Sequence, residues 1–213
     1  MKKFLMAGAA MVTVMAVSPA SAQVTGSLGI AGPNPLTLSS TGLSNGAVPV
    51  ATLVGGTVYN GDQPFADRPA GTVFGGNFLA AGPTSGNSAT LTFLTGTRFL
   101  NFLWGSPDLY NVLTVTSTAG TQTFTAAGLG FSNTAGVQSL SQYVQFTANA
   151  GTLINSVTFS NSPSIDAFEA ANFSITAPVP EPATWALMLA GFGIVGFAMR
   201  RRQSKVTTSV RFA

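Results

Sequence analysis

Residues 89–126 read ATLTFLTGTRFLNFLWGSPDLYNVLTVTSTAGTQTFTA and decide the fold class. Threonine, valine and aromatic residues fill this stretch, and Gly, Asn, Ser and Pro interrupt it at short intervals, which is typical of strands. Within 97–104 apolar side chains fall on both strand faces, with Leu100, Phe102 and Trp104 on one of them, as in a central strand. The following strands alternate apolar residues with threonine, which predicts one wet face.

This pattern continues to residue 176 without a helical periodicity. The expected strands are 89–94, 97–104, 109–117, 121–126, 142–148, 153–160 and 167–176. Upstream, Gly, Pro, Ser, Thr and Asn are frequent, and we expect strands and long loops around short apolar pieces at 48–54 and 72–79. The sequence therefore predicts an all-β domain at 23–177, an antiparallel β-sandwich that is jelly-roll-like by preference.

Composition excludes several functions for this domain. Between its two ends the chain carries two arginines and five acidic residues, a net charge of −3, so nucleic acid is a poor partner. The chain contains no cysteine and no histidine, which excludes disulfides, thiolate sites and Ser-His-Asp or Cys-His catalysis. We expect neither a cofactor nor a metal centre.

The N-terminus has the organisation of a secretory signal peptide. Lys2 and Lys3 precede an uncharged, mostly apolar run at 4–17, and Ala20 and Ala22 then form a small-x-small cleavage site. A transmembrane helix is the alternative, but this run is shorter than the roughly 17–25 residues that a span needs. We expect residues 1–22 to be removed before Gln23.

The C-terminus reads PVPEPATWALMLAGFGIVGFAMRRR at 178–202. Its segment 183–199 is uncharged and just long enough for a single transmembrane helix. The basic residues that follow it are Arg200, Arg201 and Arg202. By the positive-inside rule they keep the tail, 203–213, in the cytoplasm. A plain membrane anchor would account for the helix and the arginines, but it leaves the Pro-Glu-Pro triplet unexplained.

The triplet Pro180-Glu181-Pro182, followed by Trp185-Ala186, an apolar helix and an arginine cluster, resembles the PEP-CTERM sorting signal in its PEPxxWA variant. The resemblance implies processing by exosortase, a membrane-embedded transpeptidase of Gram-negative bacteria. It further implies transient anchoring in the inner membrane, and then residence at the cell surface or in an extracellular exopolysaccharide matrix.

Two runs within the domain, 102–111 and 167–173, resemble segments of the form WGSxDxYN and FExxNF in exosortase-dependent surface proteins. One interpretation is a candidate ligand rim that contacts a sugar or calcium. Its residues would be Trp104, Asp108, Tyr110 and Asn111. The favoured alternative is a buried tryptophan beside an Asp-initiated turn, with Glu169 satisfied by backbone amides.

The leading functional hypothesis is an exported, non-enzymatic surface or matrix protein with a structural or adhesive role. The alternative is a carbohydrate-binding module for exopolysaccharide. A carboxylate-based glycoside hydrolase is less favoured, because an offset of three places Asp166 and Glu169 on opposite faces of a strand. Asp62 and Asp67, in loop-like sequence, stay as hydrolase candidates. Ice binding is also weaker, because the Thr-x-Thr pairs recur without a constant spacing.

Overall fold

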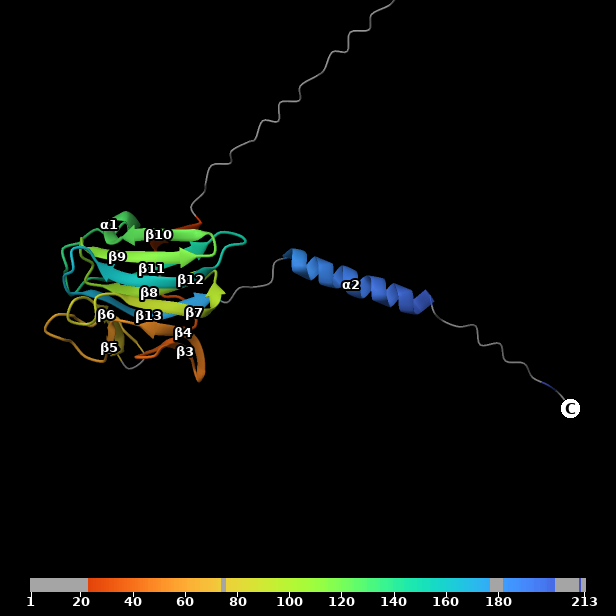
Figure 1. The fold of residues 1–213 in the computed structure, drawn as a ribbon, viewed down its shortest axis with the longest axis horizontal. Coiled ribbons are helices and arrows are strands. Elements are labelled where there is room, and N and C mark those ends of the chain that lie inside the picture. Colours follow the sequence, from red (N-terminus) through yellow and green to blue (C-terminus); the bar gives the residue numbers. More distant parts are fainter. Residues whose placement is uncertain (1–22, 74–75, 177–181, 202–210, 212–213) are drawn as a thin grey trace, which may run out of the picture.

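The computed structural model describes residues 23–73, 76–176, 182–201 and 211, and it shows two stacked antiparallel sheets (Figure 1). In spatial order the six-stranded sheet consists of β1 (Val24–Leu28), β11 (Ser141–Ala148), β8 (Phe99–Gly105), β13 (Phe168–Thr176), β6 (Phe78–Ala81) and β5 (Thr57–Tyr59). The seven-stranded sheet consists of β10 (Gly120–Thr125), β9 (Asn111–Ser117), β12 (Ile154–Asn161), β7 (Ala89–Thr97), β4 (Val48–Val54), β3 (Gly42–Asn45) and β2 (Thr37–Ser39). The predicted all-β sandwich is confirmed.

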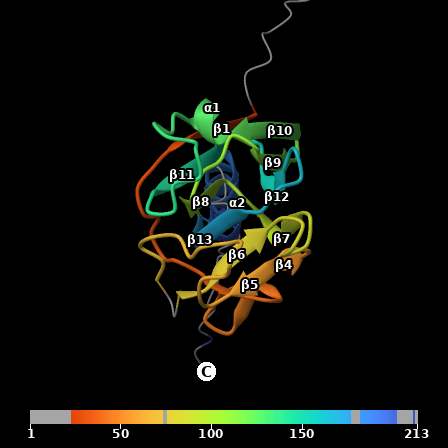
Figure 2. The same cartoon turned by 90° about the vertical axis from the view of Figure 1, so that its left-hand side faces the viewer.

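Eight of these strands, β6 to β13, form one long hairpin that is folded into both sheets. Figure 2 shows the sandwich end on, with β11, β8 and β13 on one side and β9, β12 and β7 on the other. β6 pairs with β13, β7 with β12, β8 with β11 and β9 with β10. Successive pairs lie in alternate sheets, and further pairings of β8 with β13 and of β9 with β12 join them side by side. This is the strand order of a jelly roll.

The remaining strands widen the two sheets at their edges. β1 lies beside β11, β5 beside β6, and β2, β3 and β4 extend the other sheet from β7. All the strands expected between 89 and 176 are present, with ends displaced by at most three residues. Of the two upstream apolar pieces, 48–54 is β4, whereas 72–79 contributes only its last two residues to β6.

The space between the sheets is filled by aromatic side chains. Phe102 of β8 packs against one phenylalanine from each of β11, β12 and β13, with ring centroids 5.4–6.0 Å apart. β8 lies between β11 and β13 and is buried on both faces, as the pattern at 97–104 predicts. Both apolar clusters of the described residues lie between Val24 and Ile175, so residues 23–176 have a core of their own, as an independently folding domain does.

The long connection between β5 and β6 packs on the outer face of the six-stranded sheet. Phe65 and Ala66 from this connection join Phe78 of β6 in the second apolar cluster. Farther along, Pro69 lies so close to Gly105 that a Cβ added to the glycine would meet the proline ring at 2.7 Å. This cover explains why β8 and β13 are buried on both faces, and it brings polar residues of the connection to the end of these strands.

The described residues also form two helices: α1 (Ala126–Leu129), a single turn after β10, and α2 (Pro182–Arg201), drawn apart from the sandwich in Figure 1. α2 contains the predicted helical segment 183–199, and its described side chains are exposed. In the part of the chain that the structure describes, no helix is long and apolar enough to cross a membrane, so the predicted spanning role is not shown. The predicted signal peptide, 1–22, lies outside the described residues, and so does the tail, 203–213, except residue 211.

Candidate functional site

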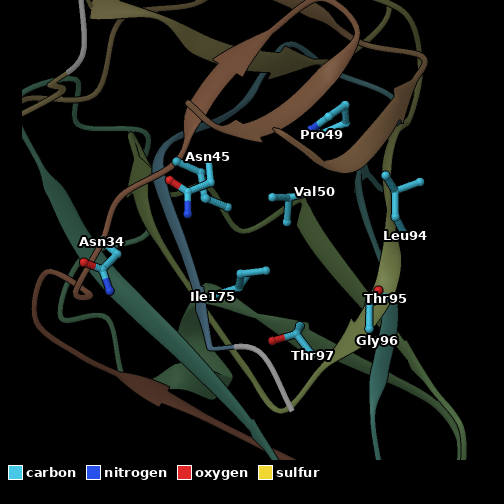
Figure 3. Close-up of a pocket in the computed structure, with 10 residues that line it drawn as sticks. Asn34, Asn45, Pro49, Val50, Leu94, Thr95, Gly96, Thr97 and Ile175 are labelled. Carbon is cyan, nitrogen blue, oxygen red and sulfur yellow. The ribbon is translucent and has the colours of Figure 1, made fainter. Parts of the chain in front are cut away.

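Two hollows of different character lie near the two ends of β13 in the described part of the sandwich. The larger, about 410 Å³, lies where β13 ends. It is lined by Asn34, Leu36, Asn45, Pro49, Val50, Leu94, Thr95, Gly96, Thr97 and Ile175. Figure 3 shows aliphatic, amide and hydroxyl side chains around it. None of these described lining residues is titratable, so this hollow presents no acid, base or charge.

The smaller hollow, about 220 Å³, lies where β13 begins. Three of its carboxyl groups come from connections and one from a strand: Asp67 follows β5, Asp108 lies between β8 and β9, Asp166 precedes β13, and Glu169 is the second residue of β13. We name it the acidic hollow, and its lining residues are Phe65, Ala66, Asp67, Ser106, Asp108, Tyr110, Ala135, Gly136, Gln138, Asp166, Ala167 and Glu169. Four of the five acidic residues of the domain therefore gather at one end of the sandwich.

The turn between β8 and β9 is held in place by Asn111. Its Oδ1 accepts the backbone N–H of Asp108 at 2.7 Å, and its Nδ2 donates to Oδ1 of Asn161 at 3.0 Å. The Tyr110 hydroxyl donates to the backbone carbonyl of Asp166 at 2.7 Å. These bonds tie the turn to β12 and to the start of β13, and so they fix two side chains, Asp108 and Tyr110, at the wall of the acidic hollow.

The four residues of the candidate ligand rim separate into two pairs. Asp108 and Tyr110 are half-buried and line the acidic hollow. Trp104 is 0% exposed and stacks on Phe168, with ring centroids 4.2 Å apart, and Asn111 is buried as well. For these two residues the rim interpretation is corrected, and the favoured alternative, a buried tryptophan beside the turn, agrees with the structure. The indole is part of the core and presents no face to a sugar ring, and Asn111 holds the turn.

The expectation that Asp166 and Glu169 point to opposite sides is also corrected. β13 begins at Phe168, so Asp166 precedes the strand and the alternation of strand side chains does not apply to it. Both carboxylates line the acidic hollow. Thr84 holds Asp166 there, with its backbone N–H 3.1 Å from Oδ1 and its hydroxyl 2.5 Å from Oδ2. Asp62, the other loop candidate, is exposed and does not line this hollow.

Glu169 is 3% exposed and only partly satisfied. The backbone N–H of Asp67 donates to its carboxyl group, but Oε2 has no hydrogen-bond partner among the described residues. Burial raises the pKa of Glu169 to about 9; the Asp67 amide opposes the rise, and the negative charges of Asp108 and Asp67 add to it. Satisfaction by backbone amides, as predicted, therefore holds for part of this carboxyl group only.

The chemistry of the acidic hollow follows from these groups. Burial raises the pKa of Asp108, with a partial offset from the neighbouring Tyr110 hydroxyl, and burial followed by the Asp108 carboxylate raises the pKa of Tyr110. At neutral pH, Glu169 holds its proton and can donate as well as accept a hydrogen bond. Within the described ranges, no three His, Cys, Asp or Glu side chains lie close enough together to hold a metal ion. The arrangement suits a ligand that makes several hydrogen bonds.

Ser106 and Gln138 are polar lining residues that were not predicted from the sequence, and Ser106 is the more deeply buried of the two. Its side chain is 5% exposed, and Oγ lacks a hydrogen-bond partner in the part of the chain described. Ser106 lies inside the WGSxDxYN run, and its φ of 41° marks a turn position. That run was the available signal, since Ser106, Asp108 and Tyr110 of this one run all reach the same hollow.

The sorting motif falls only partly within the described chain. α2 begins at Pro182, where the missing N–H of proline costs no helical bond, and it continues through Trp185 and Ala186. Arg200 and Arg201 are its last two residues. Outside the described residues lie Pro180, Glu181, Arg202 and the predicted signal-cleavage residues Ala20 and Ala22.

Comparison with protein families shows what this C-terminal stretch is. Residues 178–202 match the family model described as the PEP-CTERM protein-sorting motif. No curated protein and no solved structure matches the chain. The match covers the PEP triplet, the Trp-Ala pair, the helix and the arginines, which are the features that carried the resemblance. The chain therefore carries a PEP-CTERM sorting signal, which implies export to the cell envelope or surface and processing by exosortase.

Proposed function

We propose that this protein reaches the surface or extracellular matrix of a Gram-negative cell in three steps. The signal peptide, 1–22, directs export, and α2 then holds the protein at the inner membrane with the tail, 203–213, in the cytoplasm. Exosortase cuts near the PEP triplet and releases the sandwich outward. The observation that carries this proposal is the complete order of motif, helix and basic cluster within 178–202.

The exposure of α2 supports the membrane step. Leu189, Phe192 and Ile194 are 68–70% exposed, although each is a large apolar side chain. Burying such a side chain is worth about 1.5–3 kcal/mol, so water is an unfavourable surrounding for this helix. Lipid, or the apolar surface of a membrane-embedded enzyme, would remove that cost. The sandwich needs no such partner, because its core is complete.

For the released sandwich we propose a non-enzymatic role, structural or adhesive. Its core is dense in aromatic rings, and its one strongly charged feature is the acidic hollow. A jelly roll held together by a core of this kind is suited to persist outside the cell without disulfides. Incubation with candidate polysaccharides should release no new reducing ends, and steady turnover would contradict the proposal.

Glu181→Ala tests the sorting step. If exosortase reads the triplet, this variant should accumulate as full-length protein in the inner-membrane fraction of a host that contains exosortase. Thr184→Ala is the matched control, because it changes a variable position of PEPxxWA, and it should be processed normally. Normal processing of both variants, seen by immunoblot, would show that the triplet is not read.

A second candidate function, carbohydrate binding, is favoured by the acidic hollow. Asp108 and Tyr110 of the candidate rim line it, together with further acceptors and one protonated carboxyl group. We propose that an exopolysaccharide is the partner at this site. In this proposal the polysaccharide contacts the hydrogen-bonding side chains that line the hollow, and it does not contact Trp104.

A further inference from the structure

The acidic hollow collects negative charge without a compensating cation. Asp67, Asp108 and Asp166 line it and supply the negative charge, whereas Glu169 beside them holds its proton at neutral pH. Neither of the two arginines of the described domain, Arg68 and Arg98, is part of its wall. Gathering like charges in a partly buried space is unfavourable unless something of opposite charge binds there. The charge of this site therefore calls for a cationic ligand.

Two buried polar atoms in the same wall lack a partner. Oε2 of Glu169 and Oγ of Ser106 make no hydrogen bond with any residue that the structure describes, and their side chains are 3% and 5% exposed. A buried polar atom left unpaired costs about 1–3 kcal/mol, and such atoms are rare in folded proteins. Both residues come from the runs singled out in the sequence and line the hollow, so a shift of either side chain would bring its unpaired atom to a ligand seated there.

The geometry favours an ammonium group over a metal ion. Calcium takes six to eight oxygen ligands at about 2.3–2.6 Å, so its ligands must converge on one point. In the described ranges no three acidic side chains converge in that way. A primary ammonium donates three hydrogen bonds in diverging directions, at about 2.7–2.9 Å to carboxylates, so acceptors spread around a wall can serve it.

The size and the lining of the hollow favour a sugar as the carrier of that ammonium group. The volume of about 220 Å³ corresponds to roughly seven water molecules at about 30 Å³ each, which is room for one sugar ring. The surface that lines the hollow is predominantly polar. A lysine side chain would place its four-carbon stem against this mostly polar wall with little apolar contact, whereas sugar hydroxyls would find acceptors in Gln138 and Asp108.

The site also lies at the end of the sandwich opposite the one at which the chain leaves toward α2. Glu169 and Ile175 are six residues apart on β13, so the acidic hollow lies roughly 20 Å from the end at which the chain leaves the domain, at about 3.3 Å per residue. We propose that the acidic hollow binds the free amine of an amino-sugar residue in a polysaccharide. This inference rests on the proposed carbohydrate-binding function.

The test is isothermal titration of residues 23–176 with three β-1,4-linked trisaccharides that differ at carbon 2: the glucosamine, N-acetylglucosamine and glucose trimers. The glucosamine trimer should bind at least about tenfold more tightly than the other two, a difference of about 1.4 kcal/mol. Its affinity should fall as salt increases, because the contact is between charges. Equal binding of all three would overturn the amine preference and leave carbohydrate binding intact, whereas no binding of any would remove both and leave the sorting function untouched.

Variants and competing probes complete the experiment. Asp108→Asn should weaken binding of the glucosamine trimer about tenfold, and Ser106→Ala should weaken it less, because a neutral hydrogen bond is lost. Asp62→Asn removes the same charge from an exposed site outside the hollow and should leave affinity unchanged. If Asp62→Asn and Asp108→Asn lost affinity for the glucosamine trimer equally, the effect would come from the net charge of the domain and not from the hollow. That result would contradict the proposal.

Two further titrations test the other cationic ligands that the hollow could bind, a calcium ion and a lysine side chain. Calcium chloride alone should give no saturable heat, and N-acetyl-lysine methylamide should bind at least about tenfold more weakly than the glucosamine trimer. Saturable calcium binding that Asp108→Asn abolishes would make the hollow a metal site. Lysine binding as tight as that of the sugar would make its ligand a protein. Either result would overturn the proposal.

Discussion

The sandwich and helix α2 carry the same kinds of apolar side chain in opposite surroundings. Phe102 of the sandwich is 0% exposed among other aromatic rings, whereas Phe192 of α2 is 68% exposed. The large aromatic side chains of the sandwich core are buried, whereas the described apolar side chains of α2 are exposed to solvent. The buried core stabilises the sandwich, whereas α2 belongs to the sorting signal. Within the sandwich, the acidic hollow is lined by two buried residues, Ser106 and Glu169, that each have a polar atom without a hydrogen-bond partner among the described residues.

Phe102→Ala should have the largest effect on stability. Truncating a buried phenylalanine costs about 3–5 kcal/mol, because both burial and close packing are lost. The free energy of unfolding, from urea titration of residues 23–176, should fall by that amount. A loss below about 1 kcal/mol would mean that the rings around Phe102 do not form a tightly packed core.

The second effect is a pH dependence that originates in the acidic hollow. The pKa of Glu169 is about 9 in the folded protein against an ordinary value of 4.5. Between these values the folded state holds a proton that the unfolded chain has released, so stability is full below about pH 4.5 and is lost as the pH rises toward 9. The slope approaches about 1.4 kcal/mol per pH unit.

Melting of residues 23–176 between pH 5.5 and 8.5 should therefore show a melting temperature that decreases with pH. Glu169→Gln keeps a neutral group at this position and should flatten the dependence. Asp62→Asn, on the exposed surface, should leave the slope as it is. A slope that survives in Glu169→Gln would assign the titration to another group, with Asp67, Asp108, Asp166 and Tyr110 as the neighbours to examine.

Phe192→Ala should have the smallest effect on stability. Its side chain is exposed on a helix outside both apolar clusters of the described chain, so the melting temperature of the full-length protein in detergent should stay within error of the unmodified protein. The same substitution, phenylalanine to alanine, should therefore destabilise the protein strongly in the sandwich and hardly at all in α2. A loss comparable to that of Phe102→Ala would show that α2 packs on the sandwich.

The fold could be predicted best where strands are long and alternate. β9 reads NVLTVTS with every second residue buried, and its end at Ser117 follows from that pattern, whereas its start lies two residues after the expected one. The four strands β1, β2, β3 and β5 have only three to five residues each, and their Gly, Ser and Thr resemble loop sequence. Pairing with longer neighbours makes them strands, and pairing is not visible in the local sequence.

The acidic hollow could be predicted only in part, for a similar reason. Asp108 and Tyr110 share one run with Ser106, so the sequence pointed to their neighbourhood. Asp67 arrives there because the β5–β6 connection packs on the outer face of the sheet, which depends on tertiary contacts such as that of Pro69 with Gly105. Local reasoning therefore separated groups that the fold brings together.

Tagging the two regions separately tests the central claim, that the sandwich and α2 part company during export. One epitope is inserted after Gly46, in an exposed turn where an added Cβ meets no atom within 4 Å, and the other follows residue 213. In a host with exosortase, the first tag should reach the cell surface or the medium while the second stays in the membrane fraction. Both tags on one full-length, membrane-bound species in that host would contradict the account and leave α2 as a permanent anchor.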